Sequence, residues 1–319
     1  MQKSVTKKNY SASTATDPVD LTVPPDCAGL RLDQVLARLL PEHSRSRLTQ
    51  WVREERVSVD GVAAAPRAKM WGGERLHVQP APSRDALAHL AQDIPLEVIY
   101  EDAALLVIDK PPGLVVHPGS GNWEGTLLNA LLTHAPGTAD IPRAGIVHRL
   151  DKDTSGLLVV AKTLTAQTDL VRQLQARTVR REYVAIVHGR VAREGRVEAP
   201  IGRHPVSRTR MAVVPRGKPA VTHYSIGARY ADATLLQCRL ETGRTHQIRV
   251  HLASIGHPLL GDPVYGPRIA RGAPRILDRQ ALHAQKLGLI HPVTAREMSW
   301  EAPLPADMQE LIATLEAAA

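Results

Sequence analysis

One aspartate in this chain, Asp151, stands where a carboxylate could take part in a reaction. It follows the apolar run 145–150 and precedes the polar turn 152–156, after which a second apolar run occupies 157–161. A carboxylate at the end of a strand, held by packed segments on both sides, is well placed for chemistry. The same pattern also occurs where an Asp only organises a turn. The local sequence therefore leaves both interpretations open.

Other motifs with known chemistry are incomplete. The segment 153–156 (DTSG) is similar to the active-site motif of aspartic proteases, but it has an extra residue and no second copy. His246 and His251 do not have the spacing of a helical zinc pair, and Cys27 and Cys238 form no cysteine pair. We also find no Walker loop, dinucleotide fingerprint or nucleophile elbow. The sequence predicts neither a metal nor an organic cofactor.

The charge of the chain is unevenly distributed. Its 319 residues carry a net charge of +8, and the segment 171–220 contains twelve basic and three acidic residues, a local charge of +9. Such a concentration favours contact with phosphates over a merely solvated surface. Residues 1–8 lack the apolar core of a signal peptide, and no apolar run is long enough to cross a bilayer. We therefore expect a cytoplasmic protein with a polyanionic partner and no membrane.

The length and composition predict two domains. Residues 1–17 are polar and basic and are typical of a disordered tail. A compact unit is expected at 18–80, and the Pro-rich segment that follows indicates a linker at 81–93. Residues 94–319 would then form the second domain.

Residues 18–80 have the pattern of a small α+β unit. Apolar residues at helical spacing between 32 and 40 predict one helix, and Ser44 is a suitable N-cap for a second. Strands with tight turns are predicted at 57–62 and 71–78. The segments RLD, SRSR, RVSVDG and GGE in this unit resemble the S4 RNA-binding domain. The resemblance implies that the second helix presents its arginines to structured RNA, namely Arg45, Arg47 and Arg53.

The second domain has the pattern of an α+β sheet. Strands are predicted at 96–102 and 104–110, and helices at 127–134 and 165–177. Most of the segment 183–250 alternates in short β-like runs. Strands that follow one another, with few helices between them, argue against repeated βαβ units.

Four separated segments carry a more specific pattern. They read IDKPPGLVVHP (108–118), HRLDKDTSG (148–156), REYVA (181–185) and LETGRTHQIRVH (240–251). In this order they resemble the RluA family of RNA pseudouridine synthases, over about residues 94–305. The resemblance implies the pseudouridine synthase fold, a mixed and largely antiparallel sheet with flanking helices, and an isomerase that needs no cofactor.

The resemblance also implies catalytic roles. Asp151 is the essential carboxylate, and the sequence does not decide whether it attacks the sugar carbon or acts as a base toward a glycal. Arg249 is the cation that keeps Asp151 ionised. Tyr183 would stack on the uracil, and its hydroxyl would take the last proton with assistance, since a free phenol is a poor base at neutral pH.

A uridine in folded RNA must be flipped out of its stack before it can react. The resemblance implies that Arg149 fills the gap left by the flipped base, because a planar guanidinium can replace a stacked base. Lys152, Arg244 and the arginines of 171–220, among them Arg203, are candidates for phosphate contacts.

The substrate is predicted from further segments. Residues 143–148, 217–224 and 261–266 resemble the D-type branch of the family, which implies modification of large-subunit (23S) ribosomal RNA, a step of ribosome biogenesis, in the loop of helix 69. We expect the enzyme to be a monomer. The alternatives are a synthase that acts on transfer RNA or another ribosomal site, an inactive RNA-binding assembly factor, and an enzyme for free nucleosides. The intact set of Asp151, Tyr183 and Arg249 argues against an inactive factor, and the S4-like unit argues against free nucleosides.

Overall fold

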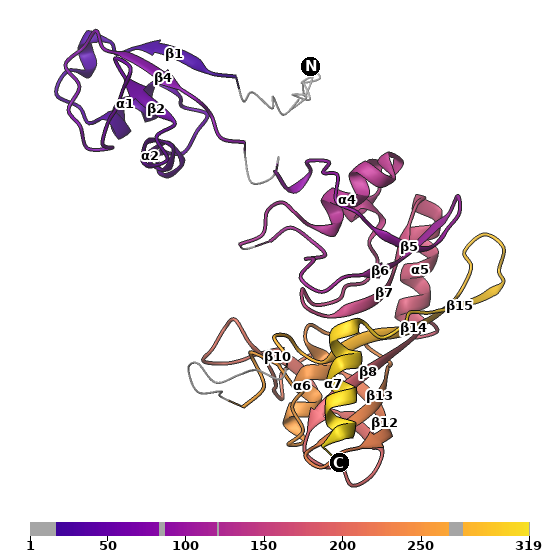
Figure 1. Ribbon diagram of the computed structural model, residues 1–319. Coiled ribbons are helices and arrows are strands. Elements are labelled where there is room, and N and C mark those ends of the chain that lie inside the picture. Colours follow the sequence, from indigo (N-terminus) through magenta and orange to yellow (C-terminus); the bar gives the residue numbers. More distant parts are fainter. Residues whose placement is uncertain (1–16, 83–86, 120, 268–276, 319) are drawn as a thin grey trace, which may run out of the picture. The chain divides into compact units, whose positions relative to one another are not determined.

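The computed structural model describes residues 17–82, 87–119, 121–267 and 277–318. The chain divides into two compact units, Met1–Leu87 and Ala88–Ala319 (Figure 1). The tail predicted at 1–17 lies outside the described residues except for its last residue. The predicted linker at 81–93 contains 83–86, which also lie outside them. The limits of these two segments stay predictions.

The N-terminal unit is a small α+β domain. Its described strands form an antiparallel sheet in the order β1-β4-β2-β3. The strands and helices are β1 (Val19–Thr22), α1 (Leu32–Leu39), α2 (Arg45–Arg53), β2 (Val57–Val59), β3 (Val62–Ala63) and β4 (Arg75–Val78). The Ser44 hydroxyl accepts a hydrogen bond from the backbone N–H of Arg47, as expected of an N-cap. The apolar faces of both helices, with Leu36 and Trp51, are buried against the sheet.

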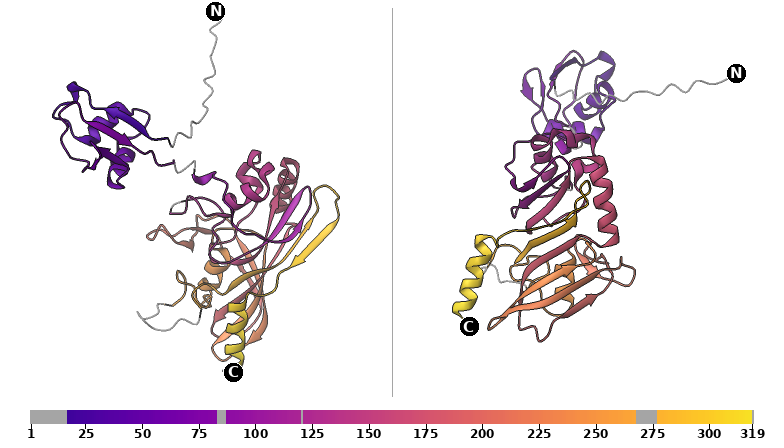
Figure 2. Two further views of the ribbon diagram at one scale, coloured as in Figure 1. Left: turned by 45° about the horizontal axis from the view of Figure 1, so that its top comes forward. Right: turned by 90° about the vertical axis from the view of Figure 1, so that its right-hand side faces the viewer.

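The second unit is built on one mixed sheet, in which the described residues provide nine strands (Figures 1 and 2). They are β5 (Glu97–Glu101), β6 (Leu105–Lys110), β7 (Ser155–Ala161), β8 (Arg180–His188), β9 (Gly195–Glu198), β12 (Val221–Arg229), β13 (Ala233–Leu240), β14 (Leu282–Ile290) and β15 (Glu297–Glu301). Their order is β5-β6-β7-β14-β8-β13-β12-β9, with β15 paired to β14, and only the β7–β14 pair is parallel. The strands β10 (Ile201–Arg203) and β11 (Met211–Val213) form a separate hairpin. The predicted α+β class, a mixed and largely antiparallel sheet with flanking helices, is confirmed.

Alternation along the strands creates two apolar faces, which different helices cover. In β8, Tyr183 and Ala185 face a core that includes α4 (Leu127–His134) and α6 (Gln247–Ser254). Val184 and Ile186 of the same strand face the opposite way, toward the C-terminal helix α7 (Ala306–Ala317), which lies at the β8, β13 and β12 end of the sheet (Figures 1 and 2). Helix α5 (Leu164–Ala176) packs on β6, β7 and β14 through a third cluster. The face with Tyr183 is the one that carries the cavity described below.

The parallel β7–β14 pair depends on Gly156. This residue has φ +110°, and a Cβ added there would lie 2.3 Å from the carbonyl oxygen of Ala284 on β14. Only glycine fits this position, because any larger residue would collide with backbone. The Gly that ends the 148–156 motif therefore lets β14 enter the sheet beside the loop that carries Asp151.

Two expectations about local structure are wrong. The run 145–150 is not a strand: a short 3-10 turn, Pro142–Gly145, contains two left-handed residues, and beyond it Ile146 makes only an isolated bridge to Val160. The end of the segment 183–250 is also not a strand. It begins α6, whose Ile248 and Leu252, four residues apart, both face the core. Burial of this helical face outweighs the β-branched composition of the segment.

Candidate active site

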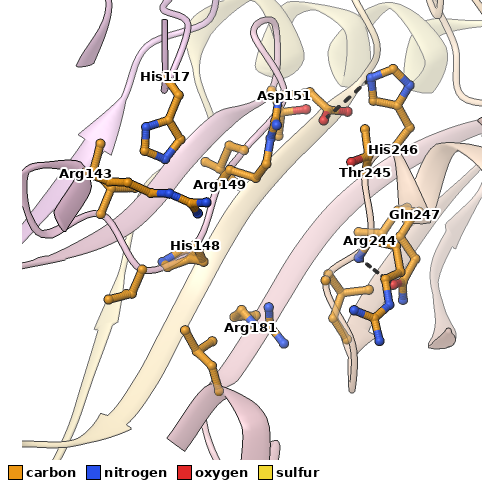
Figure 3. A pocket seen from close by; sticks show the side chains of 18 of the residues that line it. His117, Arg143, His148, Arg149, Asp151, Arg181, Arg244, Thr245, His246 and Gln247 are labelled. Atoms are coloured by element: carbon orange, nitrogen blue, oxygen red, sulfur yellow. Dashed lines mark hydrogen bonds and ion pairs between the residues drawn. The ribbon is translucent and has the colours of Figure 1, made fainter. Parts of the chain in front are cut away.

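A cavity of about 690 Å³ opens on the face of the sheet that carries Tyr183 (Figure 3). Its wall contains Asp151 and Arg149 from the loop before β7, Tyr183 from β8, Arg244 from the loop before α6, and Arg249 from α6 itself. The structure thus brings together residues from all four motifs, since His117 of the 108–118 motif also lines the cavity. The three residues predicted to be catalytic all line this one cavity.

Asp151 is held at the wall of the cavity by one strong contact. Its side chain is 15% exposed, and its Oδ2 accepts a hydrogen bond of 3.0 Å from Arg249 Nη1. Its Oδ1 makes no hydrogen bond with the described residues, and the imidazole nitrogen His246 Nε2 lies 3.9 Å from it (Figure 3). This distance is too long for a hydrogen bond. One carboxylate oxygen is therefore fixed while the other remains available.

A buried lysine holds the backbone of the loop that carries Asp151. Lys110, at the end of β6, is fully buried and donates from Nζ to three carbonyl oxygens, those of Pro111 (2.7 Å), Leu114 (3.0 Å) and Lys152 (2.9 Å). The three bonds use all three N–H groups of an ammonium. They join the 108–118 motif to the 148–156 motif and fix the backbone next to Asp151.

Arg249 is itself oriented by a second carboxylate, Asp262. Asp262 Oδ2 and Oδ1 accept from Arg249 Nε (2.8 Å) and Nη2 (2.9 Å), so the guanidinium is clamped and its Nη1 is left for Asp151. Asp262 Oδ1 also accepts from the backbone N–H groups of Val264 and Tyr265. Burial alone would lower the pKa of Arg249, but the bonds and charge of Asp262 and Asp151 outweigh it and raise that pKa. The cation is permanent.

An aromatic contact completes this side of the site. The ring of Tyr265 lies 5.1 Å from the Arg249 guanidinium carbon, and its hydroxyl is 2.9 Å from His246 Nδ1. The same hydroxyl accepts from the backbone N–H of Met211. Burial lowers the pKa of His246, so this ring is neutral at neutral pH. Among the described residues, Arg249 is the arginine that forms an ion pair with Asp151, and its charge does not depend on pH.

Tyr183 occupies the floor of the cavity. It lies in the middle of β8, opposite Cys238 on β13 and Ala284 on β14, and is 5% exposed. Burial, with the charge of Asp151 as a smaller cause, raises the pKa of its hydroxyl. The hydroxyl makes no hydrogen bond with the described part of the chain. Tyr183 is therefore a neutral phenol whose ring forms a flat apolar surface beside the carboxylate.

The predicted RNA-contact residues separate into several groups. Arg149 and Arg244 are exposed at the cavity, whereas the side chains of Lys152 and Arg203 do not line it. Arg203, on β10, donates to the carbonyl oxygen of Arg208. Lys152 contributes its backbone carbonyl to the Lys110 anchor.

The three arginines predicted to bind RNA in the N-terminal unit differ in how free their charges are. Arg45 is bound by Asp33 through two bonds to Oδ2, at 3.0 and 2.7 Å. Arg47 lies over the Trp51 ring and donates to a backbone carbonyl. Arg53 is exposed at the end of α2 and makes no ion pair with the described residues.

The sequence and the second unit also match known proteins. Residues 104–254 match the family model described as RNA pseudouridylate synthase, and residues 30–67 match the S4 domain. A protein of Nitrosomonas europaea, named ribosomal large subunit pseudouridine synthase D, is 58% identical over 96% of this chain and 92% of its own length. The chain belongs to the RNA pseudouridylate synthase family.

Further members of this family support the assignment. Proteins of the same name from Escherichia coli K12 and Neisseria meningitidis serogroup B are 54% and 51% identical, over 93% and 96% of this chain and 94% and 84% of their own lengths. A solved structure of human RNA pseudouridylate synthase domain containing 4 has a TM-score of 0.54 and 27% identity, and covers 69% of this chain and 93% of that one. The predicted family, fold and RNA pseudouridine synthase activity are confirmed. The chain is an isomerase that acts on RNA.

Three residues that support the active site were not predicted from the sequence. Asp262, Tyr265 and Lys110 lie in segments that resemble the family, but no sequence pattern indicates that Asp262 and Tyr265 contact Arg249 or that Lys110 anchors the Asp151 loop. In the described residues we find no group of three or more metal-ligating side chains that could hold an ion. No helix in the described ranges is long and apolar enough to span a membrane.

Proposed function

We propose that this enzyme converts uridines of large-subunit (23S) ribosomal RNA to pseudouridine, in the loop of helix 69, with Asp151 as the catalytic carboxylate. The observation that carries the catalytic part is the arrangement of Asp151. Arg249 binds its Oδ2 at 3.0 Å, and its Oδ1 is free of hydrogen bonds within the described residues. A carboxylate that pairs with a guanidinium at a cavity wall, with one oxygen available, suits a reaction in which positive charge develops on the sugar.

The reaction is a balanced rearrangement of one nucleotide. The bond from uracil N1 to ribose C1′ breaks, the ring turns, and a bond forms from C5 to C1′. A proton leaves C5 and N1 gains one, so no oxidant, reductant or cofactor is consumed. Asp151 acts on the sugar by addition to C1′ or by removal of the C2′ proton, and both routes use the ionised carboxylate that Arg249 stabilises.

Tyr183 supplies a stacking surface for the uracil ring. Its ring is buried beside Asp151 and lines the same cavity. Because burial raises the pKa of its hydroxyl, the phenol alone is a weak base, and we propose that it receives the C5 proton only when the reacting ring is bound against it. Arg149 is exposed at the cavity and can replace the flipped base in the RNA stack.

The ribosomal target is supported by the names of the relatives and by the N-terminal unit. Proteins 51–58% identical over almost the whole chain are named large subunit pseudouridine synthases. The S4 match at residues 30–67 and the charge of +9 at 171–220 favour structured RNA. Loop bases are partly unstacked and cost less to flip than paired ones. We propose a cytoplasmic, monomeric enzyme that uses no cofactor.

Pseudouridine mapping in a deletion strain tests this proposal. We expect the helix 69 pseudouridines to be lost, transfer RNA to be unchanged, and the wild-type gene to restore the sites. A gene that encodes Asp151→Asn, which keeps the shape of the side chain and removes its charge, should restore nothing although the protein still binds the RNA. Retention of the helix 69 sites with loss of a transfer-RNA site would contradict the ribosomal target. Restoration by Asp151→Asn would contradict the role of Asp151.

A further inference from the structure

Arg181 is a buried arginine without a partner in the described residues. It is 7% exposed, and its Nε makes no hydrogen bond. Two other arginines of the described chain are equally buried, and each has a carboxylate on two of its nitrogens: Arg249 has Asp262 and Arg279 has Asp307. Arg181 has no ion pair at all within the described ranges.

An unpaired guanidinium is costly to keep out of water, so a buried arginine without a carboxylate indicates a missing partner. The side chain of Arg181 lines the same cavity as Asp151. In Figure 3 it lies between Arg143 and His148 on one side and Arg244 and Gln247 on the other. The missing partner would therefore be a part of the substrate.

The charges around the cavity indicate what kind of group this is. Among the described residues, one carboxylate, that of Asp151, lines the cavity, and Asp262 behind the wall compensates only Arg249. Five arginines line the same cavity: Arg143, Arg149, Arg181, Arg244 and Arg249. His148 and His117 add no charge at neutral pH, since burial and the nearby arginines lower their pKa to about 3 and about 4. Uracil and ribose are neutral and cannot compensate this excess, whereas each RNA phosphate carries a full negative charge.

The position of Arg181 fits a phosphate close to the reacting base. Arg181 and Tyr183 lie on the same face of β8, two residues apart, so their Cα atoms are separated by about 7 Å. This separation is comparable with that between a pyrimidine ring and the phosphates of its own nucleotide. We propose that Arg181 binds a phosphodiester group that flanks the target uridine and so holds the flipped nucleotide with its sugar at Asp151. This inference rests on the proposed function and adds a residue that positions the substrate.

Gly243 provides the room that Arg181 needs. A Cβ at Gly243 would lie 2.8 Å from Arg181 Nη1, which is closer than such atoms approach in proteins. Gly243 precedes Arg244 in the 240–251 motif and does not have a left-handed backbone. Alanine is therefore compatible with its conformation, and the flexible end of Arg181 would move instead. The Gly243→Ala variant is thus a way to displace the Arg181 guanidinium without removing it.

The test is a coupling experiment between protein and RNA. A stem-loop that carries the site mapped in the deletion strain is made with its phosphates intact, or with a neutral methylphosphonate on the 5′ or the 3′ side of the target uridine. Single-turnover kcat/KM for pseudouridine formation is measured with the wild type, Arg181→Met and Arg180→Met. Arg180 is the matched control, because it neighbours Arg181 on β8, faces the other way and pairs with Glu297 on the surface.

We expect Arg181→Met to lower kcat/KM by about 10-fold to 100-fold, as the loss of a charge-assisted hydrogen bond implies. One of the two methylphosphonates should lower the wild-type value by a similar factor and the Arg181→Met value by less than about twofold. Gly243→Ala should show a smaller loss that disappears in the Arg181→Met background. Arg180→Met should behave as the wild type toward all three RNAs.

A thermal melt separates substrate binding from a structural role. Removal of an unpaired buried charge should leave the melting temperature of Arg181→Met equal to or above that of the wild type. A lower melting temperature of Arg181→Met would overturn the assignment. So would methylphosphonates that lower kcat/KM by the same factor in the wild type and in Arg181→Met, whether the substitution is on the 5′ or the 3′ side of the uridine. The stem-loop in this test carries the site that is mapped in cells. If that site lies outside helix 69, the stem-loop is built around the other site, and the test of Arg181 stays the same.

Discussion

Asp262→Asn is the substitution that most directly tests the geometry of the active site. The carboxylate accepts four hydrogen bonds, two from Arg249 and one each from the backbone N–H groups of Val264 and Tyr265. The asparagine oxygen can replace Oδ1, which accepts three of them. The amide NH₂ then meets Arg249 Nε, which is also a donor. Asp262 is 5% exposed, so water does not easily repair the mismatch.

The expected cost is about 3 kcal/mol, the lower end for breaking a buried ion pair, because one acceptor remains. For a domain of this size the loss lowers the melting temperature by about 6–12 °C. The guanidinium then has Asp151 as its only carboxylate and turns toward it, which covers the carboxylate needed by the substrate. We therefore expect kcat to fall more than about 10-fold, while KM changes little because Asp262 does not line the cavity.

Asp307→Asn is the matched control. Asp307 also binds an arginine, Arg279, through two bonds, but its side chain is 37% exposed and it does not line the cavity. This variant should lose some stability and keep the wild-type kcat. Melting curves and single-turnover pseudouridine formation on the same RNA measure both effects. A wild-type kcat for Asp262→Asn would refute the view that Asp262 sets the orientation of Arg249.

Three other predictions follow from single side chains. Tyr183→Phe keeps the stacking surface and loses the hydroxyl, so we expect little product and accumulation of an enzyme-bound RNA on denaturing gels; full activity would remove the hydroxyl from the mechanism. Lys110→Met leaves the carbonyl oxygens of Pro111 and Leu114 without a donor and that of Lys152 with only the Gly113 N–H, so it should cost about 2 kcal/mol or more in a urea melt, a loss that an unchanged midpoint would contradict. His148 is neutral in the folded protein, with a pKa lowered to about 3 by burial, against about 6.5 in the unfolded chain. The unfolded chain binds the extra proton between these values, so stability is full above about pH 6.5 and falls as the pH drops toward 3. The amide oxygen of His148→Gln can still accept a hydrogen bond from the Val159 N–H. Between pH 7 and 4.5 this variant should lose less stability than the wild type, and an equal loss of stability in the two proteins would exclude His148 as the cause of the pH dependence.

The sequence predicted those site residues and helices that depend on short, continuous segments of the chain. The resemblance of the 148–156, 181–185 and 240–251 motifs to the RluA family was enough to select Asp151, Tyr183 and Arg249, and the structure places all three at one cavity. The N-cap Ser44 and the helices near 127–134 and 165–177 were also found, because capping residues and apolar spacing are local signals.

The features that were missed depend on contacts between distant segments. Arg249 lies 98 residues from Asp151, and nothing in its neighbours shows that Asp262 clamps it. Arg181 was one of many arginines in a basic segment, and only its burial without a carboxylate distinguishes it. The strand expected at 145–150 failed because apolar composition does not reveal the two left-handed residues, Arg143 and Ala144, that precede it.

The place of β14 in the sheet has a consequence for the order in which the protein can fold. This strand lies between β7 and β8, although it is made about 100 residues after β8. While the chain leaves the ribosome, β7 and β8 exist with no neighbour between them, and their unpaired edges are open to wrong partners. The halves of the sheet that carry Asp151 and Tyr183 are joined only when residues 282–290 arrive. A nascent or prematurely ended chain would therefore hold every catalytic residue and still be inactive, so the enzyme cannot modify RNA before its own synthesis is nearly finished.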